Sequence, residues 1–269
     1  MRIREAGIRL TLTLALVGCG SSTPPPAQPV PTPAAPETAP APTTHAEPVA
    51  TEPVASPPKP DAPPPGSPLD RVMKAHFQDA LLIRQAVIQG SPERGADPAA
   101  VLRNLQDDLD KLPKGWRGFV ERMQDAARRI TDSTSSAQAA AAAADLGVSC
   151  GLCHKTQGGP KASTEPAPPE GTTLASRMKR HVWAADRLWE GLYVPSDEAW
   201  DAGAKALSTA RFPKEVLQTG GVHARSAAGE FGKLVAKAPA QKTADERAGL
   251  YAEMLVTCGA CHVATKGAR

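Results

Sequence analysis

The chain has 269 residues, a formal net charge of +3 and an aromatic content of only 4%. Residues 20–69 hold 18 of the 28 prolines and no Phe, Trp or Tyr, so this stretch cannot bury enough apolar surface to offset its chain entropy. The small charge and the lack of a basic patch interleaved with aromatic residues leave nucleic-acid binding without support. The remainder, residues 69–269, has a length suited to two small domains.

Residues 1–18 have the pattern of an export signal peptide. Three arginines precede an apolar run, residues 10–17, which is too short to span a bilayer as a helix. The run ends in LVGC, which resembles the lipobox of bacterial lipoproteins and implies cleavage before Cys19, acylation of its thiol and anchoring in the lipid bilayer. An ordinary signal peptide that contains a cysteine is the alternative. Gly20 stands where an aspartate would retain an enteric lipoprotein in the inner membrane, so the outer membrane is slightly favoured.

Residues 19–68 are predicted to be a disordered tether rich in proline and alanine. Such a stretch is extended and partly polyproline-like, and it can hold a folded domain away from a membrane by up to about 3.1 Å per residue. Residues 157–173, with the sequence QGGPKASTEPAPPEGTT, have a similar composition. We expect them to be a linker between two folded segments, residues 69–156 and 174–269.

Each segment is predicted to contain four α-helices, because β-branched alternation is missing and Gly/Pro turns separate the helical patterns. In the first segment these helices cover residues 69–89, 97–112, 113–131 and 135–154. In the second they cover residues 174–193, 196–210, 213–238 and 243–263. Short loops between four such helices favour an antiparallel bundle. The predicted fold is therefore all-α, with two tandem antiparallel four-helix bundles after the tether.

The two segments form an internal repeat. Apolar residues and one histidine follow a heptad pattern along the first predicted helix, at Met73, His76, Ala80, Ile83 and Val87. The residues 105 positions later are of matching types, namely Met178, His181, Ala185, Leu188 and Leu192. The halves therefore look like a duplication.

Both segments end in a CxxCH motif on the last predicted helix. The motifs are Cys150-Gly151-Leu152-Cys153-His154 and Cys258-Gly259-Ala260-Cys261-His262. This spacing lets two thiols add across the vinyl groups of one haem while the histidine binds the iron. The sequence thus predicts two covalently bound haem c groups, with His154 and His262 as proximal iron ligands. A zinc site would leave the histidines idle, and a CxxC disulfide would be strained and redox-active, so both are weaker alternatives.

The place of the motif within each segment carries a family resemblance. In class I c-type cytochromes the motif lies near the N-terminus, whereas here only seven residues follow His262. Four helices with CxxCH near the end of the last one resemble the class II c-type cytochromes, the cytochrome c′ and cytochrome c-556 type. The resemblance covers about residues 69–156 and 173–265.

The distal side of each haem is expected to face the start of the segment's first helix, because an antiparallel bundle brings the end of helix four there. His76 and His181 are candidate distal iron ligands, since a histidine on an apolar seam needs a polar partner that iron would supply. The resemblance implies Met73 and Met178 instead, or open sites as in cytochrome c′.

We therefore expect a lipid-anchored dihaem cytochrome on the periplasmic side of a bacterial membrane. It would carry single electrons between periplasmic or membrane redox partners that the sequence does not identify. A gas-binding or sensing haem protein is the alternative, and a dihaem peroxidase is a weaker one because both halves carry the same seam residues. The chain shows no paired-carboxylate, GxSxG or phosphate-loop pattern, so an enzymatic role is not predicted.

Overall fold

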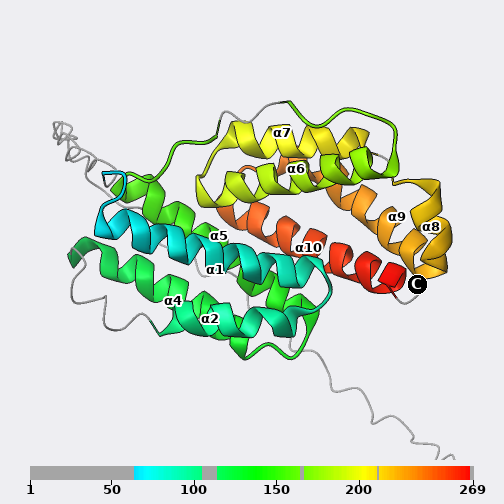
Figure 1. Ribbon diagram of the computed structural model, residues 1–269. Coiled ribbons are helices and arrows are strands. Elements are labelled where there is room, and N and C mark those ends of the chain that lie inside the picture. Colours follow the sequence, from blue (N-terminus) through cyan, green and yellow to red (C-terminus); the bar gives the residue numbers. More distant parts are fainter. Residues whose placement is uncertain (1–63, 105–113, 164–166, 211, 267–269) are drawn as a thin grey trace, which may run out of the picture. The chain divides into compact units, whose positions relative to one another are not determined.

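The computed structural model describes residues 64–104, 114–163, 167–210 and 212–266 (Figure 1). The predictions for the signal peptide, for the lipid anchor at Cys19 and for the tether before residue 64 lie outside these residues. The described residues form helices and no β-strand, which confirms the all-α class. No helix among them is long and apolar enough to cross a membrane.

The helices of the two segments are as follows. The first segment contains α1 (Pro68–Ile88), α2 (Ala96–Arg103), α4 (Arg117–Thr131) and α5 (Ser136–Gln157). The second contains α6 (Leu174–Tyr193), α7 (Asp197–Thr209), α8 (Lys214–Thr219), α9 (Gly221–Lys237) and α10 (Ala244–Lys266). Short 3-10 helices cover Pro92–Gly95, Lys114–Trp116 and Ala238–Ala240.

Hydroxyl side chains cap the starts of α1, α5, α6 and α7. Ser67, Ser135, Thr173 and Ser196 each accept a hydrogen bond of 3.1 to 3.2 Å from the backbone N–H three residues later. At the start of α10, Thr243 does the same and its own N–H donates to the glutamate three residues later, which completes a capping box. These caps satisfy the free N–H groups of the first turns and place most helix starts within a few residues of the predicted ones.

The third helix of the second segment differs from the prediction. Residues 213–238 were expected to form one helix, but the chain breaks at Gly220 into α8 and α9, and Gly221 has a φ of +61°. A Cβ atom at Gly220 would meet Ala224 and lie 3.0 Å from Cγ2 of Thr265 on α10. The break therefore occurs where the backbone approaches α10 closely.

The helices of each segment pack in a ring. In the first segment α1 packs against α2 and α5, and α4 packs against α2 and α5; in the second α6 packs against α7 and α10, and α9 packs against α7 and α10. The two segments also pack on each other, because α5 contacts both α6 and α10 and α1 contacts α10.

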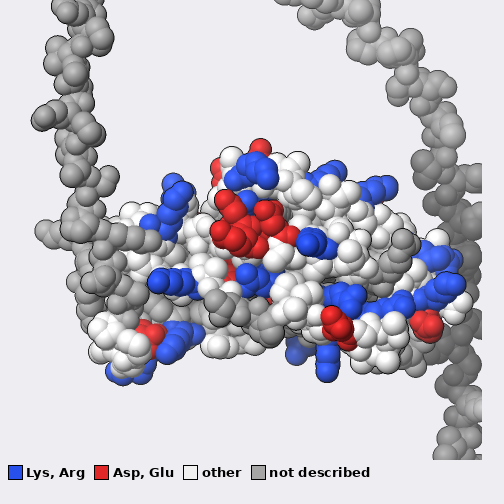
Figure 2. All heavy atoms as spheres, turned by 90° about the horizontal axis from the view of Figure 1, so that it is seen from above, with Lys and Arg blue, Asp and Glu red and all other residues white. Residues whose placement is uncertain are grey.

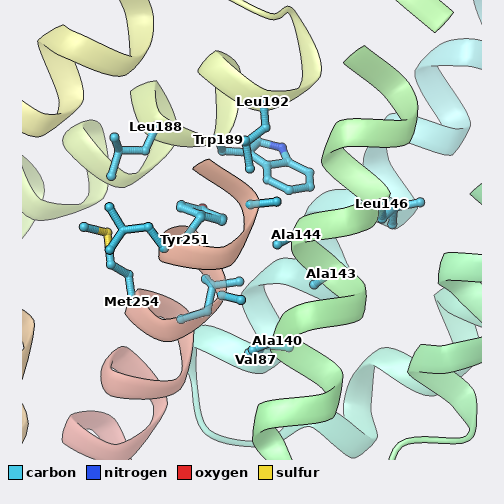
Figure 3. Close-up of a cluster of buried hydrophobic side chains, with 14 of the residues drawn as sticks. Val87, Ala140, Ala143, Ala144, Leu146, Leu188, Trp189, Leu192, Tyr251 and Met254 are labelled. Atoms are coloured by element: carbon cyan, nitrogen blue, oxygen red, sulfur yellow. The ribbon is translucent and has the colours of Figure 1, made fainter. Parts of the chain in front are cut away.

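One hydrophobic core runs through both segments (Figure 3). This core contains the buried alanines of α5, among them Ala140, Ala143 and Ala144, together with Val87 of α1, Trp189 of α6 and Tyr251 of α10. Apolar residues surround α5 on several sides, as in helices buried by neighbours all round. The small alanine side chains let those neighbours approach. Two separate tandem bundles are thus not confirmed, since the segments share their core.

Charged side chains of both signs lie on the face seen from above (Figure 2), where Lys and Arg are scattered and Asp and Glu form one larger group near the middle and several smaller ones apart from it. This mixture agrees with the small net charge of the chain.

Candidate haem sites

A cavity of about 530 Å³ lies at the second CxxCH motif. The end of α10 contributes Cys258, Cys261 and His262 to its lining, and the first turns of α6 contribute Met178 and His181. These are the residues that the sequence placed on the proximal and distal sides of one haem. Their cavity has the size of a cofactor site.

His181 is oriented as a metal ligand would be. Its ring donates a hydrogen bond to the carbonyl of Ala210, while Nε2 is buried without a hydrogen-bond partner. The residue is 9% exposed, and its ring packs 4.6 Å from that of Phe212. Burial lowers the pKa of His181, so the imidazole is neutral and its lone pair is free to bind a metal. A carbonyl that holds the other ring nitrogen is the usual partner of a ligating histidine.

Burial keeps the titratable residues of the second motif uncharged near pH 7. Burial lowers the pKa of His262, helped by the nearby Lys266, so this imidazole is also neutral near pH 7. Burial raises the pKa of Cys258 to about 12, an effect that the Arg84 charge opposes, and burial raises the pKa of Cys261. Both cysteines are free thiols.

Apolar side chains complete the cavity and would keep water from a bound planar ring. They come from four helices and the turn before α8, and they are Ile88, Leu174, Val182, Phe212, Val216 and Phe231. Two thiols, two neutral imidazoles and an apolar wall match what haem c requires. The residues at the second motif therefore fit this cofactor.

The first motif has a similarly held histidine. His154 Nδ1 lies 2.6 Å from the carbonyl oxygen of Tyr193, at the end of α6. In the tautomer that donates this bond, Nε2 is left as the metal-binding atom. Burial lowers the pKa of His154, and burial together with the charge of Cys153 raises the pKa of Cys150 to about 12. A Cβ atom at Gly159 would collide with the His154 side chain, so this position needs glycine.

The start of α1 lies near the first motif. The ring of Phe77 packs 4.8 Å from that of Tyr193, and the Tyr193 ring lies 6.4 Å from that of His154. Figure 1 shows the start of α1 close to the end of α5, in agreement with these contacts. Met73 and His76 are half-buried on the same turns of α1. Their role as distal ligands stays a prediction. In the second segment Phe212 lies beside His181, but the corresponding turn of the first segment falls in residues 105–113, which lie outside the described residues.

Arg84 is a site residue that sequence reasoning missed. It lies on α1, in the first segment, but it lines the cavity of the second motif together with Asp186 of α6. The internal repeat could have indicated this residue. The counterpart of Arg84 in the second segment is Trp189, so the two halves differ here by a charged and an aromatic residue, both on the buried side of a helix.

Within the described ranges, no three or more His, Cys, Asp or Glu side chains come together as a metal-binding group. Compared with known proteins, the chain matches no family model, no curated protein and no solved structure.

Proposed function

We propose that the protein is a dihaem c-type cytochrome that carries single electrons at the bacterial cell envelope. The observation that carries this proposal is the cavity in which Cys258, Cys261 and His262 meet His181 with its unpartnered Nε2. A bound haem c would supply an iron that changes between the ferric and ferrous states. The protein would attach and orient this group and keep water away from it.

The side chains at the second site divide this work. The thiols of Cys258 and Cys261 would form the thioether bonds, and His262 would be the proximal ligand. His181, held by the carbonyl of Ala210, would be the distal ligand, and the Phe212 ring beside it would exclude water. Met178 lines the same cavity and is the alternative distal ligand.

By the repeat, the first site would use Cys150, Cys153 and His154 in the same way, with His76 or Met73 on the distal side. Tyr193 would orient His154 through its carbonyl oxygen. Each ring of four packed helices would then be one haem-binding bundle of the class II type, joined to the other through α5 and α10.

The chemistry of attachment tests the proposal directly. Protein produced in a bacterium with haem-attachment machinery should carry two haems that survive acid-acetone extraction. Replacing Cys258 and Cys261 with Ala should leave one such haem, and the matched pair Cys150→Ala with Cys153→Ala should leave the other. Haem that is fully extracted from the unmodified protein would refute the c-type assignment.

Spectra then separate the carrier from the gas-binding alternative. Low-spin absorption and EPR spectra in both redox states support six-coordinate irons and electron transfer. A high-spin ferrous protein that binds carbon monoxide rapidly would instead assign the sites to gas binding, with open distal positions.

The proposed location is the periplasmic side of a bacterial membrane, with the acylated Cys19 in the bilayer and unidentified redox partners in reach of the tether. Cys19→Ser should release a soluble protein that still carries both haems, because a tether of about 50 residues would separate the lipid anchor from the folded part. Membrane fractionation in high salt measures this, and a variant that stays in the membrane fraction would place the anchor elsewhere.

A further inference from the structure

Arg84 brings a buried positive charge from the first segment into the cavity of the second. Its side chain is 6% exposed, and it lines the cavity with Cys258 and His262. The guanidinium group stays protonated in proteins, so the charge is permanent. The role that we assign to it rests on the proposed function.

Three contacts hold the guanidinium group in place. Nε donates to the hydroxyl oxygen of Tyr251 at 2.6 Å, and a terminal nitrogen donates to Asp186 Oδ1 at 2.6 Å. The guanidinium carbon also lies 5.9 Å from the centre of the Trp189 ring. Each of these partners lies on α6 or α10, so the charge has a fixed place in the second segment although it comes from α1.

The Asp186 carboxylate does not cancel this charge. Its side chain is 51% exposed, so water and salt screen its field, whereas the Arg84 charge is almost fully removed from water. Of the charged residues that line the cavity, Lys266, Asp186 and Glu215 are exposed and Arg84 alone is buried, so the Arg84 charge is the one that water and salt screen least. The repeat counterpart of Arg84 is the uncharged Trp189, and the counterpart of Asp186 is Leu81. The pair is thus a feature of one half of the repeat.

We propose that Arg84 raises the reduction potential of the second haem above the value that its ligands alone would set. Reduction adds one electron and removes one positive charge from the iron, so a nearby fixed cation favours the ferrous form. No proton needs to move, because Arg84 stays charged in both states. Transfer of an electron from the first haem to the second would oxidise the first iron and reduce the second. If the ligands of the two haems are alike, this transfer would lower the free energy, because the second haem would have the higher reduction potential.

Redox titration of the complete, haem-loaded protein with a chemical reductant tests this assignment. We expect two one-electron waves, one for each haem. Arg84→Met should lower the midpoint potential of one wave and leave that of the other unchanged. A tenfold loss in the ratio of reduced to oxidised second haem at a given potential corresponds to about 59 mV for one electron. Asp186→Asn should shift the same potential by less than Arg84→Met does, because water and salt screen the charge at its exposed position.

The chain offers a matched control in Arg247 of α10. Its side chain is 7% exposed, it forms an ion pair of 2.7 Å with the exposed Asp197, and its guanidinium carbon lies 5.3 Å from the centre of the Trp200 ring. This pair resembles the Arg84 pair in burial and partners but does not line the cavity. Arg247→Met should therefore lower stability without shifting either wave.

The outcomes separate the two proposals. A protein without covalent haem refutes the proposed function. Two waves that Arg84→Met leaves unchanged, or shifts equally, refute the role of Arg84 while the carrier function stands. If Arg84→Met does not fold, Arg84→Gln decides, because it removes the charge and keeps a side-chain donor for the partners of Arg84, and a potential that it leaves unchanged overturns the inference.

Discussion

Both CxxCH sites contain an imidazole that a backbone carbonyl holds. At the first site the carbonyl of Tyr193 holds His154, the proposed proximal ligand, and at the second the carbonyl of Ala210 holds His181, the proposed distal ligand. The Ala210 carbonyl is available because α7 ends there in an extended conformation, with a ψ of 98°. A ring that is fixed before metal binding loses little freedom when the metal arrives. This favours histidine over methionine at the second site.

The first prediction concerns these ligands. His181→Ala should turn one haem high-spin and able to bind carbon monoxide, whereas Met178→Leu should leave the spectrum nearly unchanged. The reason is that His181 presents a buried nitrogen without a partner, while a thioether can pack in the cavity as an apolar group. Absorption and EPR spectra measure the spin state. The opposite pair of results would assign the iron to Met178.

His76 offers the matching test at the first site. His76→Ala should affect only the haem that His181→Ala leaves intact, and Met73→Leu is its control. If the spectra of the unmodified protein already show five-coordinate iron, neither histidine is a ligand and the gas-binding reading replaces the carrier.

Tyr251 leads to a second prediction, on alkaline stability. Burial raises the pKa of Tyr251 to about 12, and the Arg84 charge only partly opposes this shift. Because the unfolded protein ionises first, near pH 10, this neutral hydroxyl stabilises the fold below pH 10, and the stabilisation is lost as the pH rises to about 12. The loss amounts to about 3 kcal/mol at 1.36 kcal/mol per pKa unit.

Tyr251→Phe should flatten this loss, which urea unfolding at pH 9, 10 and 11 measures. At neutral pH the variant should be less stable by about 1 to 3 kcal/mol, because Arg84 Nε loses its acceptor. In the haem-loaded protein the four cysteines are thioethers and cannot contribute to the slope. An equally steep alkaline loss in the variant would contradict the assignment to Tyr251.

At the scale of helices, two glycines of α5 set how closely the segments approach. A Cβ atom at Gly147 would lie 2.6 Å from Cζ3 of Trp189, and one at Gly151 would collide with the carbonyl oxygen of Leu192. Both contacts are with α6. The glycines therefore let α5 and α6 pack with almost no space between them, beside the first CxxCH motif.

The third prediction follows from this contact. Gly147→Ala should destabilise the protein by about 1 to 3 kcal/mol, because the added methyl group overpacks the core against a rigid indole ring. Gly229→Ala on α9 is the control, since nothing lies within 4 Å of its added Cβ. It should stabilise the helix by up to about 1 kcal/mol. Thermal or urea unfolding measures both, and equal effects would contradict the packing argument.

The helices themselves were largely predictable from the sequence. The bounds 174–193 agree with those of α6, because Thr173 caps its start and the heptad pattern runs to its end. The break at Gly220 was not predictable, since it depends on the approach of Thr265 from α10. Likewise, periodicity placed His181 on a buried face, but only the folded chain shows that its partner is Ala210 and that Arg84 reaches the same cavity.

At the scale of the whole folded part, α1 links the two sites. Phe77 in its middle contacts Tyr193 beside His154, while the carbonyl oxygen of Gln89 just after its end accepts a hydrogen bond of 3.1 Å from Lys266, beyond His262. From Phe77 to Ile88, which lines the second cavity, the helix rises by about 16 Å. The internal repeat predicted two separate units. It gave no indication that α1 contacts both of them, because a repeat describes each half by itself.

The last prediction tests whether the two halves depend on each other. A chain that ends at residue 156 would expose the face of α5 that packs on α6 and α10, including the alanines around Ala143 and the groove at Gly147. We expect such a chain, and its counterpart beginning at residue 174, to be expanded and to bind the dye ANS, as compact states without fixed packing do. The complete folded part should instead unfold in one transition, with coincident midpoints for the two haem signals and for circular dichroism. Two stable half-chains, or two separate transitions, would show that each segment is an independent domain and that the shared core adds little.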